Sequence, residues 1–244
     1  MQYIRALLPA ADARAGLDIA APVYRPRLEV LRAALALLAF VSLGGCASLS
    51  NTGVDTVRLL ATGGPVIALD PQAVAASPYA RMQIEGAGLR AVAVLGNDDA
   101  GLQSWYGDAR RVVFMRGGQL VATAGLSVNA DDIRIEGDNP FLHLAQVGRE
   151  PVPVSRRYDW RNGYRYGVQV SGSLSRRGQE TVDILGTPRD LVRYEEVLRG
   201  PGVRASNEYW ADPQTGYIWK SRQLVAPGTM LELVVLKPYL PGGS

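Results

Sequence analysis

The most regular pattern along the chain, from Arg81 onward, is an alternation of apolar and polar residues. It is clearest in residues 164–174, where one face would carry Tyr164, Tyr166, Val168, Val170 and Leu174. Successive side chains of a β-strand point to opposite faces of the sheet, so this alternation predicts a half-buried antiparallel strand.

Similar short segments follow one another over most of the chain. We expect strands near residues 89–95, 103–106, 112–115, 120–123, 133–135, 156–160, 164–174, 180–185, 191–198, 206–210, 217–225 and 230–237. Turn signals separate several of them, namely Gly117-Gly118, Asn162-Gly163, Arg177-Gly178 and residues 213–216. No long amphipathic helix lies between them, which argues against a parallel α/β sheet. The pattern predicts a mainly β protein, a curved antiparallel sheet or open β-barrel-like single domain with short N-terminal helical turns.

Two short segments before these strands have helical character, residues 56–61 and 71–76. Asp70 is a suitable N-cap for the second, Pro71 suits the first helical position, and Pro78 should end it. The least regular stretch, residues 139–153, contains three prolines and is expected to cross between two halves of the sheet.

The N-terminal region contains an uncharged apolar run, residues 33–45, behind Arg25 and Arg27. Its length suits the apolar region of a signal peptide and is too short to span a bilayer. The run ends in Leu43-Gly44-Gly45-Cys46, a lipobox, in which cleavage leaves Cys46 to carry the lipid. The alternative is a short buried helix that ends in an ordinary core cysteine.

This lipobox divides the chain into three parts. Residues 1–45 form a leader that is removed, residues 46–55 a small, polar tether, and residues 56–244 one β-rich domain. Acyl chains such as palmitate on Cys46 would anchor the protein stably. Ala47 follows the cysteine where an Asp would signal retention in the inner membrane, so we expect the outer membrane, facing the periplasm.

Composition excludes several classes of site. The net charge is +3, but 5 of the 26 basic and 3 of the 23 acidic residues precede Cys46, so the mature part is almost neutral and gives no case for nucleic-acid binding. One cysteine excludes an internal disulfide, and one histidine, His143, excludes most zinc sites. We expect no metal and no cofactor.

Several motifs resemble the group 4 capsule polysaccharide lipoprotein family, the YjbF/GfcB type. After the lipobox they are Ser77-Pro78-Tyr79-Ala80, Trp105-Tyr106 with Asp108, Gly117-Gly118-Gln119-Leu120 through Thr123-Ala124-Gly125-Leu126, and Asn207-Glu208-Tyr209-Trp210-Ala211-Asp212. The resemblance covers about residues 46–240 and implies a mainly antiparallel outer-membrane lipoprotein encoded with exopolysaccharide or capsule secretion genes. It implies no catalytic residues.

Aromatic and basic side chains are the candidates for contact with a glycan or a protein partner. Flat rings suit the apolar faces of sugars, although strands and cores also favour aromatics. The basic group surrounds the Asn162-Gly163 turn and would meet an acidic polysaccharide or lipid phosphates, unless it is only a solvated hairpin tip. The candidates are Trp105, Tyr106, Trp160, Arg156, Arg157 and Arg161.

The sequence supports a catalytic role less well than a binding role. Acidic residues such as Asp98, Asp132 and Glu136 would supply a carboxylate pair for glycoside cleavage, but they occupy turn-like positions where Asp bonds the local backbone. His143 lies in an apolar stretch and is expected to be buried and hydrogen-bonded.

The sequence therefore favours a non-enzymatic accessory lipoprotein of exopolysaccharide or capsule assembly or export. Its expected partners are the membrane, through the lipid anchor, and a polysaccharide or other secretion-system proteins. The alternative is a carrier that holds a lipid or another apolar ligand in a β-trough.

Overall fold

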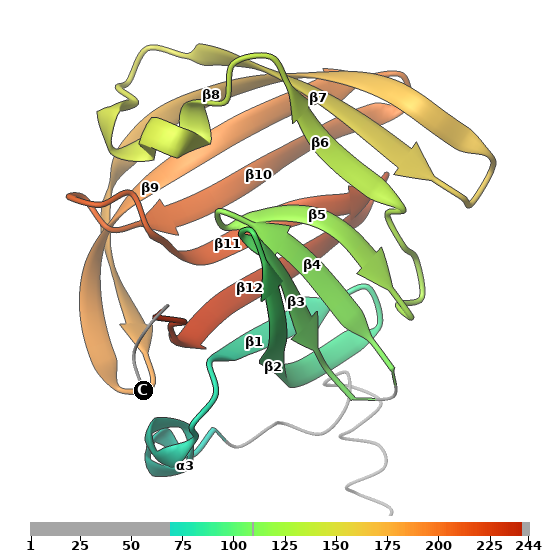
Figure 1. Cartoon of the computed structure of the whole chain (residues 1–244). Helices are drawn as coiled ribbons and strands as arrows, with labels where there is room; N and C mark the ends of the chain where they lie inside the picture. Colours follow the sequence, from blue (N-terminus) through green and yellow to red (C-terminus); the bar gives the residue numbers. More distant parts are fainter. Residues whose placement is uncertain (1–68, 109, 241–244) are drawn as a thin grey trace, which may run out of the picture. The chain divides into compact units, whose positions relative to one another are not determined.

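A computed structural model describes residues 69–108 and 110–240, which form one twelve-stranded antiparallel sheet that curls into a nearly closed barrel (Figure 1). The mainly β prediction is confirmed. The strands are β1 Arg81–Gly86, β2 Leu89–Asp99, β3 Leu102–Tyr106, β4 Val112–Arg116, β5 Gln119–Ala124, β6 Asp132–Glu136, β7 Val152–Trp160, β8 Arg165–Ile184, β9 Thr187–Gly200, β10 Val203–Ala211, β11 Ile218–Ala226 and β12 Thr229–Lys237.

The first and last strands do not lie at the edges of this sheet. The strand order is β5-β4-β3-β2-β1-β12-β11-β10-β9-β8-β7-β6, so the first and last strands pair with each other in the middle. The free edges are β5 and β6, which are consecutive in sequence and face each other at the front of Figure 1. We call this meeting of the two edges the seam.

The barrel interior is filled by the inward faces of the strands. Side chains from all twelve strands form one core cluster, to which β2, β11 and β12 contribute most, and a smaller one surrounds Phe141, Leu174 and Tyr194. On β7 the alternation places Val154, Arg156, Tyr158 and Trp160 inward. An arginine therefore lies among core residues.

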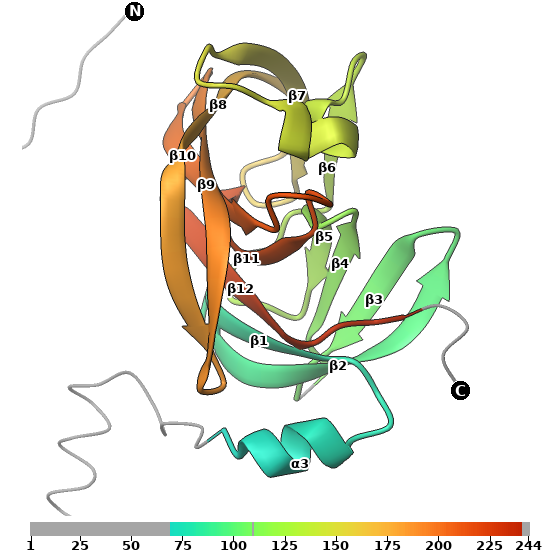
Figure 2. The same ribbon diagram turned by 90° about the vertical axis from the view of Figure 1, so that its left-hand side faces the viewer.

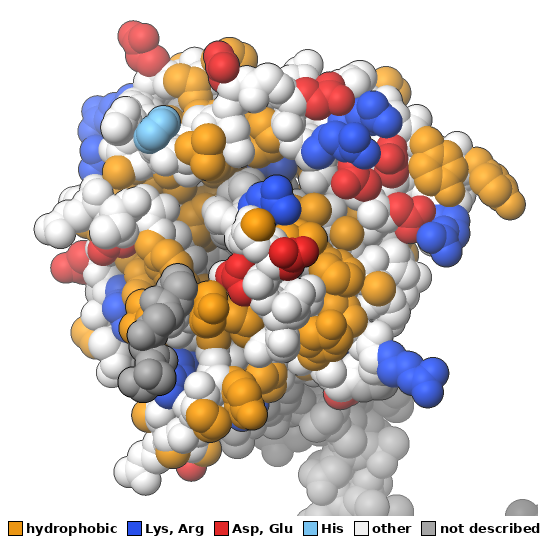
Figure 3. All heavy atoms as spheres, viewed as in Figure 1, with side chains coloured by type: hydrophobic (Ala, Val, Ile, Leu, Met, Phe, Trp, Pro, Cys, Tyr) orange, Lys and Arg blue, Asp and Glu red, His pale blue; other side chains and the backbone are white. Residues whose placement is uncertain are grey.

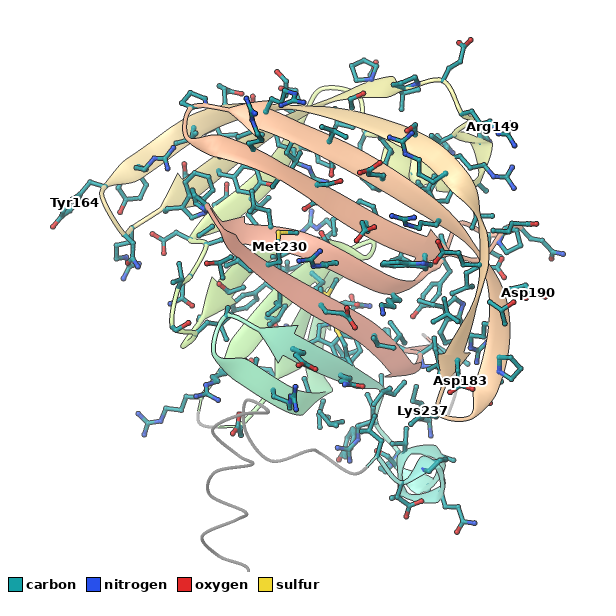
Figure 4. All side chains as sticks on the ribbon, turned by 180° about the vertical axis from the view of Figure 1, so that it is seen from behind. Arg149, Tyr164, Asp183, Asp190, Met230 and Lys237 are labelled. Carbon is teal, nitrogen blue, oxygen red and sulfur yellow. The ribbon has the colours of Figure 1, made fainter. Side chains whose placement is uncertain are left out.

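The short helix before the sheet forms as predicted. Helix α3 spans Pro71–Ala76, and the Asp70 side chain caps it by accepting from the Gln72 amide at 2.9 Å. Lys237, at the end of β12, donates from Nζ to the carbonyl of Ala75 at 2.9 Å, which ties α3 to the last strand (Figures 2 and 4). The other predicted helical segment, residues 56–61, lies outside the described residues.

Two connections were predicted wrongly. Arg177-Gly178 is not a turn, because β8 continues through it with a register shift between Arg176 and Gly178 and turns only at Leu185-Gly186. The resulting β8–β9 hairpin projects beyond β7 and β10, with Asp183 near its tip and Asp190 closer to its base (Figure 4). Residues 139–153 do not cross between sheet halves either, because they join β6 to its neighbour β7 through the 3-10 helix η1, Pro140–Gln146.

The face predicted for residues 164–174 is only partly correct. Val170 and Leu174 are buried, but Tyr164 and Tyr166 are 87% and 54% exposed. The reason is their place at the tip of the β7–β8 hairpin, where Figure 4 shows Tyr164 pointing into solvent. The Asn162-Gly163 turn itself is confirmed.

Candidate functional site

A buried ion pair between Arg156 and Glu196 organises the polar part of the barrel interior. Arg156 comes from β7 and Glu196 from β9, and both side chains are almost completely shielded from solvent. The guanidinium donates from Nε to Glu196 Oε1 at 2.6 Å and from Nη2 to Oε2 at 2.9 Å. This two-point geometry is the strongest arrangement available to an arginine and a carboxylate.

Three further side chains complete the network. Asn207 donates from Nδ2 to Glu196 Oε2 at 2.9 Å, and the Tyr209 hydroxyl lies 2.9 Å from the same oxygen. Gln119 reaches in from β5, and its Oε1 accepts from Arg156 Nη2 at 2.7 Å. Because β5 and β7 are not neighbours in the sheet, this contact joins the two sides of the seam from the inside.

The network holds its groups in fixed protonation states. Although burial opposes its charge, the attraction of Glu196 raises the pKa of Arg156 further above its ordinary value, so the guanidinium stays charged. Burial, followed by the negative charge of Glu196, raises the pKa of Tyr209 well above its ordinary range. Burial also raises the pKa of Tyr158 to about 12. The tyrosines are therefore neutral donors at physiological pH.

A cavity of about 570 Å³ lies at the seam, over the buried network. We call it the seam cavity. Its polar lining consists of Arg116, Gln119, Asp132, Arg134, Asn139 and Arg156. Its apolar lining consists of Leu102, Leu120, Val121, Ile133 and Ile135. Figure 3 shows basic side chains among apolar ones on this face. Three arginines in the wall do not favour a carrier of an apolar ligand.

Two hydrogen-bond donors at this cavity have no protein partner. The Nε2 atom of Gln119 is buried and has no hydrogen-bond partner, and the residue as a whole is only 6% exposed. Within residues 69–108 and 110–240, Nη1 of Arg156 likewise donates to no protein acceptor, since the bonds of that side chain leave from Nε and Nη2. A buried donor without a partner, such as Gln119 Nε2, is rare in folded proteins, so it calls for an explanation.

The aromatic candidates fall into two groups. Trp105 and Trp160 are each only 2% exposed, and the Trp160 indole donates to the carbonyl of Val225 at 2.6 Å, so both pack inside the barrel. Tyr106 is 49% exposed, and its ring lies over Gly96 of β2, where an added Cβ would approach it to 2.6 Å. Contact with a glycan or partner stays a prediction for these residues, and Tyr106 alone among the three presents its ring to solvent.

The basic candidates are not brought together. Arg156 points into the barrel, whereas Arg157 points outward, 3.9 Å from Glu136. Arg161, at the hairpin tip, is 78% exposed and lies 3.4 Å from Asp131. Strand alternation explains the separation, because adjacent residues of one strand face opposite sides of the sheet.

The histidine prediction was wrong. His143 is exposed, because η1 turns only Phe141 and Leu144 toward the core. The turn role expected for the acids holds for Asp98, whose carboxylate accepts from the Gly101 amide at 2.9 Å.

Sequence reasoning missed Gln119 and Glu196. A signal was present for Glu196, since residues 191–198 place it on the same face as Tyr194 and Leu198. A lone acid on an apolar strand face needs a buried partner, and Arg156 is the matching lone base on the apolar face of residues 154–160. Gln119 had no such signal, because its role depends on how the seam closes.

These features define a structural class of protein. Its members consist of one antiparallel sheet that curls into a barrel, with an ion pair in the core and a polar cavity at the seam. The chain belongs to the family described as group 4 capsule polysaccharide lipoprotein gfcB, YjbF, whose model matches residues 54–236.

A curated protein and a solved structure from Escherichia coli K12 are both similar to this chain. The uncharacterized lipoprotein GfcB is 27% identical over 203 residues, which cover 80% of this chain and 94% of the relative. The crystal structure of the hypothetical lipoprotein YmcC matches with a TM-score of 0.64 at 24% identity and covers 80% of this chain and 99% of that one. The second comparison supports the fold.

The predicted anchor lies outside the described residues. Cys46, the leader of residues 1–45 and the tether of residues 46–55 all precede residue 69. In the part of the chain that the structure describes, no helix is long and apolar enough to cross a bilayer.

Proposed function

We propose that this protein is a non-enzymatic accessory factor in the assembly or export of a capsule or exopolysaccharide. It is held by a lipid on Cys46 at the outer membrane, faces the periplasm, and contacts the polymer or other secretion proteins through its β-rich body. The observation that carries the proposal is membership of a capsule polysaccharide lipoprotein family over residues 54–236, a short distance after a lipobox at residues 43–46.

The interior geometry supports binding over turnover. Among the described residues, Asp132 is the one carboxylate in the wall of the seam cavity, and it already contacts Arg134, so they offer no carboxylate pair for glycoside cleavage there. The donors of Arg156 and Gln119 are instead held in place by a rigid network, as recognition of a ligand requires.

Deletion of the gene tests the role. We expect surface polysaccharide to fall under conditions that induce its synthesis, and plasmid-borne wild-type protein to restore it. Cys46→Ser should leave the protein unprocessed and should not restore the polymer. Unchanged polysaccharide in the deletion strain would contradict the proposal.

Membrane fractionation and metabolic labelling with a tagged fatty acid test the location. Labelled wild-type protein should appear in the outer-membrane fraction, and Cys46→Ser should stay unlabelled. A wild-type product that retains residues 1–45 would contradict the anchor.

A further inference from the structure

We propose that the seam cavity is a binding site for an acidic saccharide, that is, a sugar unit with a carboxylate. The site would use Arg116, Arg156 and Gln119 as its donors. This inference rests on the proposed function, because contact with a polysaccharide supplies the saccharide. The arginines of the cavity wall add the requirement that this saccharide be acidic.

The charge of the wall favours an anion. Arg134 is neutralised by Asp132 at 2.5 Å, with Asp159 at 3.8 Å, and Arg156 by Glu196. Arg116 stands at the tip of the β4–β5 hairpin, exposed, and within residues 69–108 and 110–240 it has no acidic partner. The cavity therefore carries one uncompensated guanidinium at its mouth, which suits a carboxylate in two-point geometry.

Hydrogen bonds within the buried network fix the orientation of the unpartnered donors. Gln119 Oε1 accepts from Arg156 Nη2, so the opposite end of the amide, Nε2, must be a donor. Turning the amide would set its NH2 group against the guanidinium, which has no acceptor. Arg156 is locked by Glu196 through Nε and Nη2, which leaves Nη1 free. Both donors belong to residues that line the cavity and would be satisfied by ligand oxygens.

Size and shape fit a sugar unit better than a bare ion. A volume of about 570 Å³ exceeds the space one small anion needs and lies within the ~300–1,000 Å³ typical of small-molecule sites. Leu120, Ile133 and Ile135 supply apolar wall, which suits the C–H faces of a pyranose ring. Asn139 adds an amide group beside the donors.

The test uses the detergent-solubilised mature lipoprotein and three probes, with dissociation constants measured by isothermal titration calorimetry. The probes are trigalacturonate, the same trisaccharide with its carboxyl groups reduced to alcohols, and glycerol phosphate. We expect trigalacturonate to bind at least about tenfold more tightly than the other two, because only it offers both carboxylates and sugar hydroxyls.

Variants then locate the site. Arg116→Gln should weaken trigalacturonate binding by about tenfold, whereas Arg149→Gln, an exposed arginine outside the cavity lining, should leave binding unchanged. Both positions are exposed, so both variants should fold, and their thermal unfolding midpoints check this. In an NMR titration, the Gln119 side-chain amide should shift with trigalacturonate and not with the reduced probe.

Each contrary outcome points to a different error. Equal affinity for the reduced trisaccharide would overturn acidic selectivity and leave polysaccharide contact standing. Equal affinity for glycerol phosphate would overturn the saccharide and indicate a simple anion site or a lipid headgroup site. Binding that Arg116→Gln does not change would place the ligand elsewhere. Failure of all three probes would overturn the inference, while the gene deletion tests the proposed function independently.

Discussion

The Arg156–Glu196 pair adds little to the net free energy of unfolding, but losing either partner is costly. Burying two charges costs several kcal/mol per ion, and a well-made pair roughly cancels this, so such pairs add little net stability. Removing one partner, however, costs about 3–5 kcal/mol, because the other charge stays buried alone. What the pair provides is a fixed arrangement of β5, β7, β9 and β10 around one point. That rigidity is what a donor array at the seam cavity needs.

Gly172 of β8 makes room for the Glu196 carboxylate. A Cβ at this position would lie 2.7 Å from Glu196 Oε1 and 3.1 Å from Val154 Cβ. Gly172→Ala should therefore lower the free energy of unfolding by about 1–3 kcal/mol through overpacking against the ion pair. Urea unfolding measures this, with Gly178→Ala as the control on the same strand.

The control is informative because a Cβ at Gly178 meets no atom within 4 Å. It should change the free energy of unfolding by less than about 0.5 kcal/mol or stabilise slightly. Equal losses in the two variants would mean that backbone effects, and not the carboxylate, determine the result.

Tyr158 makes stability depend on alkaline pH. Burial raises its pKa to about 12 in the folded protein, so below pH 10 both states keep the proton and the full stability is present. Between pH 10 and 12 the unfolded state ionises first, and the free energy of unfolding falls, by about 3 kcal/mol in total. Tyr158→Phe lacks this loss, so its stability relative to wild type should rise over that range.

Urea unfolding at pH 8, 10 and 11 follows the change. Tyr164→Phe is the control, because that side chain is 87% exposed and its hydroxyl is outside the buried network. Parallel curves for wild type and Tyr158→Phe would contradict the assignment of the alkaline loss to this residue.

At the scale of elements, the β4–β5 hairpin is fastened to β11 by one side chain in place of a strand ladder. Gln223 Oε1 accepts from the Leu120 amide at 2.9 Å, and its Nε2 donates to the carbonyl of Gly118 at 2.8 Å. Gly118 itself has φ +76°, and a Cβ there would lie 2.9 Å from Ile218 of β11. The hairpin tip that carries Gln119 into the barrel is thus positioned from across the interior.

Gln223→Leu keeps the size of this side chain and removes both hydrogen bonds. We expect a loss of about 1–3 kcal/mol in the free energy of unfolding, because the Leu120 amide and the Gly118 carbonyl lose their partner. Hydrogen exchange in a peptide over residues 115–124 should become faster. Gln179→Leu, at an exposed position of β8, is the matched control and should change neither quantity.

The elements show how far local sequence reaches. Alternation located most strands, and Gly117-Gly118 and Asn162-Gly163 marked real hairpins, because these signals act within a few residues. The turn predicted at Arg177-Gly178 was wrong, because a glycine permits a β-bulge as readily as a turn. Only the pairing of β8 with β9 determines which of the two forms. Most of the candidate site could not be predicted from the sequence. Arg156 and Glu196 are 40 residues apart, and Gln119 comes from β5, at the edge of the sheet opposite to β6 and β7.

At the scale of the whole molecule, the pairing of the first strand with the last determines where the sheet can open. The first and last strands, β1 and β12, pair over Arg81–Gly86 and lie in the middle of the sheet, where each has a partner on both sides. The unpaired backbone groups belong instead to β5 and β6, which the chain joins directly through residues 125–131. At that connection the Thr123 amide donates to the carbonyl of Ala130 at 2.9 Å and closes one end of the seam.

This arrangement predicts an uneven pattern of hydrogen exchange by mass spectrometry. Peptides over β5 and β6 should exchange fastest among the strands, because one side of each lacks a ladder partner, whereas peptides over β1 and β12 should be as protected as those over β9 and β10. Slow exchange at β5 and β6 would mean that the seam is closed by hydrogen bonds and that the cavity between them admits no polymer. Fast exchange at β1 and β12 would mean that the barrel opens between its first and last strands, and the rigid donor array at the seam would then lose its support.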